Sequence, residues 1–215
     1  MKPTKIIPKY AVLPLIAVFV FNMIAYYGGF VFAKDAYHYN ISVALDGKIP
    51  LVEFFIIFYF LAYLQWVISY IFIARESAEV CYRYATAVSI SKIFCLILFL
   101  AFPTTLVRPA PGEGLFGSIV SFLYTVDEPT NLLPSIHCLE SWVCFRASLS
   151  MKKLPSWYKI ITLFFSVAVF LSTVFVKQHV VLDIPAGILV FEAGLLIVKL
   201  TGIDSKLRSV FTRRT

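Results

Sequence analysis

The chain alternates long apolar runs with short segments that carry most of its charge. Five runs contain few or no charged residues: 10–32, 52–74, 84–105, 155–176 and 184–200. A helix needs about 20 apolar residues to cross the hydrocarbon core of a bilayer. The pattern therefore predicts five spanning helices, and the first run is longer than the apolar part of a signal peptide. Lys92, inside the third run, is expected to extend toward the nearer membrane surface.

A sixth run, residues 136–151, is apolar but contains both Glu140 and Arg146. Because ionisable side chains are costly in lipid, this helix is expected inside the bundle rather than at its surface. Glu140 lies one turn after His137, and either binding a hydroxylated headgroup or pairing with Arg146 would suit it. Six spans place both termini on the same side of the membrane. The sequence thus predicts an all-α, integral membrane bundle of six transmembrane helices.

The longest connection, residues 106–135, separates the third and fourth predicted spans. It contains LFGSIVSFLYTV (115–126), which is too short to cross a bilayer and is expected to form an interfacial or re-entrant helix. No internal repeat or low-complexity segment divides the chain. Residues 1–215 are therefore expected to form a single transmembrane domain.

Composition agrees with the membrane class. Hydrophobic residues make up 60% of the chain and charged residues only 14%, and the mean hydropathy is +0.86. Soluble domains carry about 25% charged residues. The net charge of +7 does not indicate nucleic-acid binding, because the basic residues lie between the apolar runs instead of along one soluble face.

The basic residues predict how the bundle is oriented. Only four of the 19 Lys and Arg residues, Lys34, Lys48, Arg108 and Lys177, fall in segments on the side opposite the termini. Because Lys and Arg are retained on the cytoplasmic side, both termini are expected there, and the connection 106–135 is expected on the extracytoplasmic side. The four cysteines have no metal-ligand spacing and are expected to be small packing residues.

Two polar clusters interrupt the apolar pattern on the predicted outer side. NLLPSIHCLES (131–141) contains His137, and VKQHVVLDIPAG (176–187) contains His179 and Asp183. A carboxylate bonded to one imidazole nitrogen makes the other a better nucleophile or base, and a second His can protonate a leaving group. If the helices that follow the clusters are neighbours, these three residues form a catalytic set.

Nearby residues add the features of an anion site. Arg108 and Lys177 would neutralise a phosphate, and Ser135 is placed to cap the helix that begins near His137, so that backbone N–H groups face outward. Two imidazoles and a carboxylate also suit zinc, but adjacent cations and the lack of an HExxH pattern disfavour a metal. Taken singly, Asp183 is equally typical of a helix N-cap and Lys177 of an interface anchor.

The clusters resemble the three motifs of the type 2 phosphatidic acid phosphatase superfamily of membrane lipid-phosphate phosphatases and phosphotransferases. The first family motif has Lys, six residues, then Arg-Pro, and here Arg108-Pro109 follows Ala101. The second is Pro-Ser-Gly-His, here PSIH (134–137). The third is Ser-Arg, five residues, His, three residues, Asp. Here Ser172, His179 and Asp183 keep the spacing, but Thr173 stands at the Arg position.

The resemblance implies roles for these residues. His179 would be the nucleophile that forms a phosphohistidine, Asp183 would orient it, and His137 would be the general acid. Arg108 and Ser135 would hold phosphoryl oxygens without a metal or other cofactor. Lys177 is a hypothetical replacement for one of the two cations missing at Ala101 and Thr173.

We therefore expect a lipid phosphatase that hydrolyses a lipid phosphate or diphosphate at the extracytoplasmic face of the cell membrane. A lipid phosphotransferase of the inositol-phosphoryl or choline-phosphoryl type is the alternative, with Asp127, Asn131 and Glu140 as candidate headgroup ligands. Asp127 and Asn131 are also consistent with a solvated turn. A non-catalytic lipid-binding relative is a third possibility. His38 receives no role, and Glu192 is expected to face the bundle interior.

Overall fold

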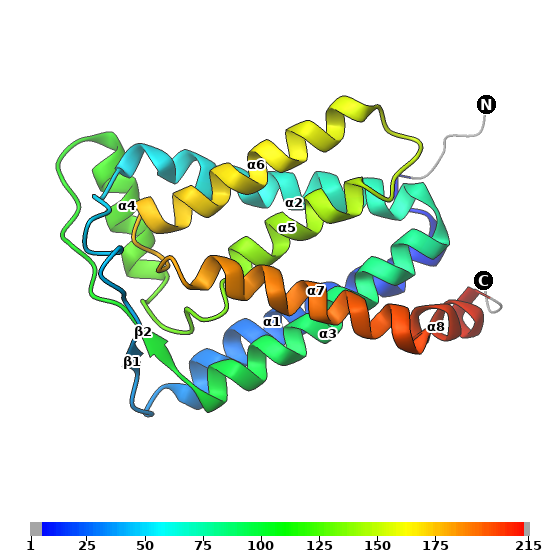
Figure 1. Ribbon diagram of the computed structural model, residues 1–215, viewed down its shortest axis with the longest axis horizontal. Coiled ribbons are helices and arrows are strands. Elements are labelled where there is room, and N and C mark those ends of the chain that lie inside the picture. The colour runs from blue at the N-terminus through cyan, green and yellow to red at the C-terminus, as the bar shows by residue number, and fades with distance from the viewer. Residues whose placement is uncertain (1–5, 213–215) are drawn as a thin grey trace.

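The computed structural model describes residues 6–212, and these fold into a bundle of helices (Figure 1). The helices are α1 (Lys9–Ala33), α2 (Ile56–Glu76), α3 (Ala78–Ala101), α4 (Leu115–Val126), α5 (Ile136–Ser148), α6 (Ser156–Phe175), α7 (Asp183–Thr201) and α8 (Ile203–Thr212). A 3-10 turn, Glu53–Phe55, leads into α2, and two-residue strands β1 (Tyr39–Asn40) and β2 (Thr104–Thr105) join two loops. The predicted all-helical class is confirmed.

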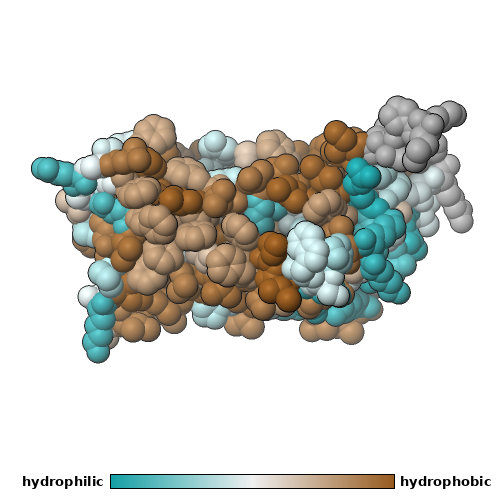
Figure 2. Space-filling model, turned by 90° about the horizontal axis from the view of Figure 1, so that it is seen from above, coloured by the Kyte–Doolittle hydropathy of each residue, from teal (hydrophilic) through white to brown (hydrophobic). Residues whose placement is uncertain are grey.

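Five helices are long and apolar enough to cross a membrane. They are Lys9–Ala33, Glu53–Glu76, Ala78–Ala101, Ser156–Phe175 and Asp183–Thr201, and they coincide with the five long apolar runs of the sequence. Figure 2 shows apolar side chains covering most of one face between the two more polar ends of the molecule. These features are those of a membrane protein that contacts the lipid bilayer.

The predicted span at 136–151 is a shorter helix, α5. α5 has 13 residues, hence about 20 Å of length, against about 30 Å of hydrocarbon. It packs against α2, α3, α6 and α7 in the middle of the bundle (Figure 1). Glu140 and Ser141 are accordingly buried by protein, as expected for a polar helix in a membrane bundle.

The residues at the helix ends explain where the helices begin and stop. Ser77 lies in extended conformation between α2 and α3, and its hydroxyl accepts a hydrogen bond from the Val80 N–H at 3.1 Å. Pro155 precedes α6, where its missing N–H costs nothing. Gly202 adopts φ of 62°, the left-handed conformation that ends α7 and turns the chain into α8. Helix α8 was not among the elements predicted from the apolar pattern.

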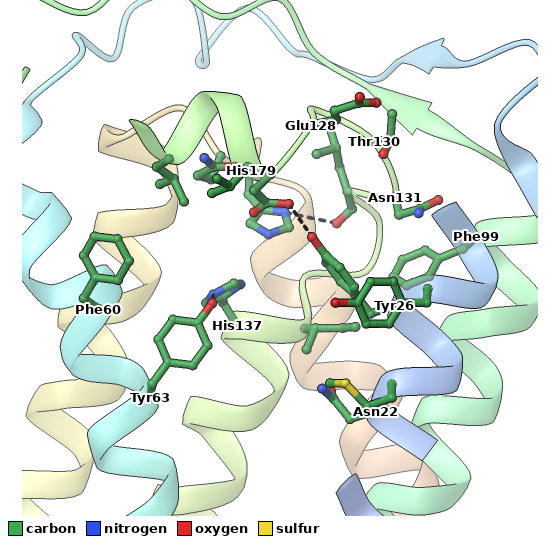
Figure 3. A pocket seen from close by; sticks show the side chains of 18 of the residues that line it. Asn22, Tyr26, Phe60, Tyr63, Phe99, Glu128, Thr130, Asn131, His137 and His179 are labelled. Atoms are coloured by element: carbon green, nitrogen blue, oxygen red, sulfur yellow. Dashed lines mark hydrogen bonds between the residues drawn. The ribbon is translucent and has the colours of Figure 1, made fainter. Parts of the chain in front are cut away.

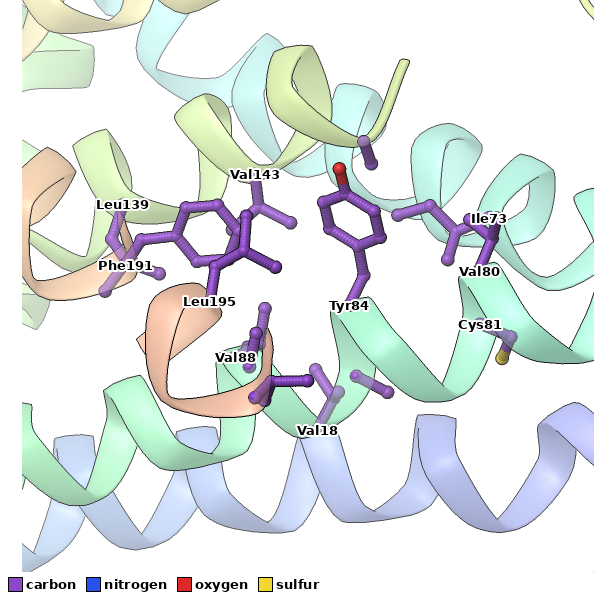
Figure 4. Close-up of a cluster of buried hydrophobic side chains, with 14 of the residues drawn as sticks. Val18, Ile73, Val80, Cys81, Tyr84, Val88, Leu139, Val143, Phe191 and Leu195 are labelled. Carbon is purple, nitrogen blue, oxygen red and sulfur yellow. The ribbon is translucent and has the colours of Figure 1, made fainter. Parts of the chain in front are cut away.

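The largest core cluster joins α3, α5 and α7. Tyr84 and Val88 of α3 pack with Val143 of α5 and with Phe191 and Leu195 of α7 (Figure 4). The four cysteines are buried and unpaired, in keeping with their expected packing role. This core fixes α5 against α7, so the assumption that the two helices are neighbours is correct.

The predicted position of Lys92 and the predicted pairing of Glu140 with Arg146 were wrong. Lys92 does not reach a membrane surface: it is fully buried, and its ammonium lies 2.7 Å from Glu140 Oε1. Glu140 therefore pairs with Lys92, while Arg146 pairs with Glu192 at 2.8 Å. Both pairs join helices distant in sequence, and such contacts depend on helix rotation. The Glu192 side chain is about a third exposed (34%).

Short strands and loops cover the end of the bundle where α5 and α7 begin. β1 and β2 are parallel, and Thr105 also bridges to Thr130, so the loops that follow α1 and α3 are joined to the loop before α5. Strands of two residues are too short to produce an alternating pattern in the sequence. Of the basic residues assigned to the cytoplasmic side, Lys2, Lys5, Arg213 and Arg214 lie outside the described residues.

Candidate active site

His179 lies in the turn between α6 and α7. The backbone N–H groups of Gln178 and His179 both donate to the Thr173 carbonyl, at 2.9 and 3.0 Å, and this fixes the turn after α6. His179 Nδ1 lies 3.0 Å from Asp183 Oδ2, which also accepts from the Val180 N–H at 3.0 Å. Asp183 is completely buried and is the first residue of α7, whose N-cap position is Leu182. Asp183 thus orients the imidazole and is not the N-cap.

A second acceptor at Nδ1 determines the tautomer of His179. The Leu132 carbonyl oxygen lies 3.1 Å from Nδ1, so this nitrogen faces two acceptors. A nitrogen between two acceptors must carry the proton, which leaves the lone pair of the neutral ring on Nε2. Nε2 is therefore the nucleophilic or basic atom.

His137, the second residue of α5, is held by aromatic side chains of α2. Its ring stacks on Tyr59, with centroids 4.3 Å apart, and lies 5.3 Å from Trp66. The Tyr63 hydroxyl is 3.2 Å from His137 Nε2. The rings of His137 and His179 have centroids 6.1 Å apart, close enough for both to contact one substrate group.

Close packing of α5 and α7 produces this distance. The Ser135 N–H donates to the Asp183 carbonyl at 3.3 Å. A Cβ atom on Gly187 of α7 would lie 2.6 Å from the Ser135 carbonyl oxygen, so only glycine fits. Ser135 caps α5 as expected: its buried Oγ accepts from the Cys138 N–H at 3.2 Å.

Both imidazoles line one cavity of about 380 Å³, which we call the histidine cavity (Figure 3). Asn22 and Tyr26 of α1 form one wall, Phe60 and Tyr63 of α2 another. Helix α1 packs mainly on α3, and α2 packs on α5 and α6, so the cavity lies between two helices that are not closely packed together. Apolar and aromatic side chains make up much of its lining.

Arg108 lies beside the histidine cavity but is held by protein acceptors. Its guanidinium donates to the Lys177 carbonyl at 3.2 Å, to the Asp127 carbonyl at 2.6 Å and to Gln178 Oε1. It also covers the ring of Tyr124, 4.6 Å from the centroid. Burial lowers the pKa of Arg108 and the Asp127 carboxylate raises it, but a guanidinium remains charged throughout the physiological range.

Lys177 faces away from the histidine cavity. Its ammonium donates to the carbonyls of Asp46 and Ile49, at 3.0 and 2.6 Å, and burial lowers its pKa. Lys177 and Arg108 both line a separate hollow of about 580 Å³ under the loops, which we call the outer hollow. His179 lines both spaces and separates them.

The three candidate headgroup residues do not all line the histidine cavity. Asp127 and Asn131 line the histidine cavity, and the Asp127 carboxylate accepts from the hydroxyls of Tyr26 (2.9 Å) and Tyr59 (3.2 Å). Glu140 is absent from the cavity lining, because it binds Lys92 and the Tyr70 hydroxyl inside the bundle. His38 is exposed, and its Nδ1 lies 2.9 Å from the Ala36 carbonyl.

The two positions that depart from the family motifs have different surroundings. The Thr173 hydroxyl is buried and donates to the Phe170 carbonyl of its own helix at 2.8 Å. Ala101 is exposed at the end of α3. Neither side chain supplies a donor to the histidine cavity, whose lining contains no Lys or Arg among the described residues.

Sequence reasoning missed several residues that the fold brings to the site. The main ones are Tyr59, Tyr63 and Trp66 around His137, and Gln178 beside His179. The aromatic residues looked like ordinary spanning-helix residues, and only the i, i+4 and i, i+7 spacing of Tyr59, Tyr63 and Trp66 suggested a shared face. Gln178 had only its position next to His179 as a signal.

Within residues 6–212, no group of three or more His, Cys, Asp and Glu side chains has the arrangement of a metal site. No protein-family model, curated protein or solved structure matches the chain. Function therefore has to be inferred from the site itself. The arrangement comprises His179 with its tautomer fixed, His137 with its ring centroid 6.1 Å away, and a largely apolar cavity that both line.

Proposed function

We propose that the protein is a membrane lipid phosphatase that transfers a phosphoryl group from a lipid phosphate or diphosphate onto His179. The observation that carries the proposal is the His179–Asp183 pair facing His137 across the histidine cavity. The Asp183 carboxylate and Leu132 carbonyl leave a lone pair on His179 Nε2, and His137 lies on the far side of the reacting group. The motif spacing of the type 2 phosphatidic acid phosphatases supports the same roles.

In the first step, Nε2 of His179 attacks phosphorus as the bond to the lipid oxygen breaks. With the phosphate dianion bound beside it, His137 carries a proton and gives it to the departing oxygen, so the lipid leaves as an alcohol or as a phosphate. The phosphorylated imidazole keeps its Nδ1 proton, and the buried Asp183 carboxylate stabilises the positive charge on the ring. The intermediate is a phosphohistidine.

In the second step, water attacks phosphorus and loses a proton to His137, which is now neutral. The P–N bond breaks, inorganic phosphate leaves, and His179 returns to its original tautomer. His137 ends protonated, as it began, so one water is consumed for each phosphate released. Arg108 does not line the histidine cavity, but its guanidinium binds Oε1 of Gln178, which does.

The surroundings of the cavity favour a lipid over a soluble phosphate ester. The histidine cavity is bounded by α1 and α2, two of the helices long enough to span a membrane, and its walls include Met23, Phe60 and Phe99. An acyl or isoprenyl chain would lie against these side chains while its phosphate reached the histidines. The substrate class we propose is therefore a lipid phosphate or diphosphate within the bilayer.

We further propose six crossings, with both termini cytoplasmic and the histidines near the extracytoplasmic face. The bias of Lys and Arg supports this orientation. Helix α5 together with residues 149–155 would form the fourth crossing, within protein surroundings that satisfy its polar groups. Loops following α1, α3 and α6 would then cover the site from the outer side.

Phosphate release by detergent-purified protein tests the proposal. The native chain and a His179→Ala variant would be given phosphatidate, lysophosphatidate and an isoprenyl diphosphate. His38→Ala is the matched control, since His38 is exposed and is not part of the site. We expect release by the native chain and the control, and a loss of at least about 10³-fold with His179→Ala. If none of the three proteins released phosphate, a simple phosphatase would be excluded.

A phosphotransferase is the second candidate, and a side hollow favours it. This hollow, of about 300 Å³, adjoins the histidine cavity and shares Tyr26, Asp127 and Asn131 with it. Apart from Val126, the described residues that line it have aromatic, hydroxyl, amide or carboxylate side chains, and none is Lys or Arg. A polyol or amine headgroup would suit it. Phosphodiester formation from labelled phospholipid and inositol or a ceramide would favour this candidate, whereas inorganic phosphate as the sole product would exclude it.

A further inference from the structure

Gln178 lies next to the proposed nucleophile, and only one end of its side-chain amide has a hydrogen-bond partner. Its side chain is 2% exposed, and Nε2 has no hydrogen-bond partner among the described residues. Gln178 lines the histidine cavity together with His137 and His179. Leaving a buried amide donor without a partner destabilises the folded protein, so the unpaired Nε2 of Gln178 calls for an explanation.

Arg108 determines which end of the amide is unpaired. The guanidinium contacts Gln178 Oε1, and a guanidinium can only donate hydrogen bonds. Oxygen must therefore face Arg108, which leaves the NH₂ group as the end with no partner. The backbone N–H of Gln178 is bound to the Thr173 carbonyl, so the residue is fixed at both its main chain and its side-chain oxygen.

A phosphoryl oxygen is the acceptor that fits this donor. The reacting phosphorus would lie between His137 and His179, in the cavity that Gln178 also lines. Arg108 lines the outer hollow and is absent from the histidine cavity lining. Its hydrogen bond to Oε1 polarises the amide and strengthens the Nε2 donor, because hydrogen bonds in a chain reinforce one another.

Thr173 cannot take this role. Its hydroxyl is buried and donates to the Phe170 carbonyl within α6, so no donor at the family's Arg position faces the substrate. The described lining of the histidine cavity contains no Lys or Arg that would replace that Arg. Gln178 is the fully buried donor nearest in sequence to the nucleophile.

We propose that Gln178 is a phosphoryl-binding residue whose Nε2 donates to a non-bridging oxygen of the group that His179 attacks, and that Arg108 is a positioning residue that acts through Gln178. The assignment rests on the proposed function of the histidine pair. In this assignment the neutral amide of Gln178 binds the phosphoryl oxygen, and Arg108 binds the amide. No arginine contacts the phosphoryl group directly.

Orthovanadate binding tests the assignment without requiring the natural substrate. Vanadate mimics a phosphoryl group under attack, and its affinity for detergent-purified protein is measured by calorimetry. Gln178→Glu keeps the size of the side chain and its contact with Arg108 but replaces the donor by an acceptor. Gln178→Met removes the donor without adding charge. We expect the Kd for vanadate to rise about 10- to 100-fold with Met, and further with Glu.

Gln65→Met is the matched control, because Gln65 binds the Thr162 carbonyl between α2 and α6 and does not line the cavity. Its Kd for vanadate should equal that of the native chain. Thermal melting of each variant identifies misfolding, and Gln178→Met decides the outcome if the Glu variant does not fold. Native-like vanadate affinity in a folded Gln178→Met variant would overturn the assignment while leaving His179 chemistry intact. No vanadate binding and no phosphate release by the native chain would instead refute the proposed function.

A double-mutant cycle tests the part played by Arg108. If Arg108 acts through Gln178, Arg108→Met should weaken vanadate binding in the native background and have little effect in the Gln178→Met background. A role limited to holding the loops would change melting temperature by the same amount in both backgrounds and leave no coupling in vanadate affinity. Additive losses in affinity would show that Arg108 contacts the anion independently.

Discussion

At the scale of single residues, Lys92 and Glu140 form an ion pair in the interior of the bundle. Lys92 is fully buried, Glu140 is 4% exposed, and the Tyr70 hydroxyl donates to the second carboxylate oxygen at 2.7 Å. The pair joins α3 to α5 only one turn below His137. Its net contribution to stability is small, because desolvation of both charges offsets their attraction, but each charge requires the other.

Replacement of one partner should therefore be costly. Lys92→Met leaves the Glu140 carboxylate buried without a cation and is expected to lower the free energy of unfolding by about 3–5 kcal/mol. Unfolding in mixed micelles with increasing SDS measures the change. The double variant Lys92→Met/Glu140→Gln should regain most of the loss. If the double variant is no more stable than the single one, the pair is not a coupled unit.

At the scale of elements, the approach of α5 to α7 positions His137 relative to His179 and Asp183. Gly187 brings α7 against the start of α5, where an added Cβ would lie 2.6 Å from the Ser135 carbonyl oxygen and 3.1 Å from the Leu139 nitrogen. Both are backbone atoms, which cannot rotate away. Any larger residue must separate the helix that carries His137 from the one that begins at Asp183.

Gly187→Ala is accordingly expected to reduce phosphate release by about 10²-fold, because small displacements of reacting groups cost this much. Initial rates and melting temperature are measured together. Gly194→Ala is the control, since its Cβ would contact the Ala87 carbonyl of α3 at 2.7 Å, away from the histidines. The control should lose stability but keep its rate per folded molecule. Equal rate losses in both variants would argue that general loosening, not the α5–α7 distance, limits turnover.

At the scale of the whole molecule, the proposed orientation places the loop after α1 outside the cell and α8 inside. Lys48 and Lys206 are exposed at these two ends, and all four native cysteines are buried, so background labelling should be low. Lys48→Cys should react with a membrane-impermeant maleimide on intact cells. Lys206→Cys should react only after permeabilisation. The opposite pattern would reverse the proposed orientation and put the histidines on the cytoplasmic side.

The sequence by itself determined the five long helices and their membrane character. Apolar runs of about 20 residues have few alternatives in lipid, because every backbone polar group must be satisfied within the segment. Five of the predicted spans, at 10–32, 52–74, 84–105, 155–176 and 184–200, correspond to long helices. The family resemblance also implied that Asp183 orients His179, and the two side chains are paired at 3.0 Å.

Only the tertiary structure decided which of the polar residues meet. His137 and His179 are 42 positions apart, and their contact depends on a glycine that lets two helices touch. Helix rotation directs Glu140 to Lys92, and the turn between α6 and α7 directs Lys177 to the outer hollow and Gln178 to the cavity. Apolar patterning specifies which residues form a helix, but it leaves open which face meets which neighbour. Those contacts arise from side-chain packing between distant segments, and they make the candidate site.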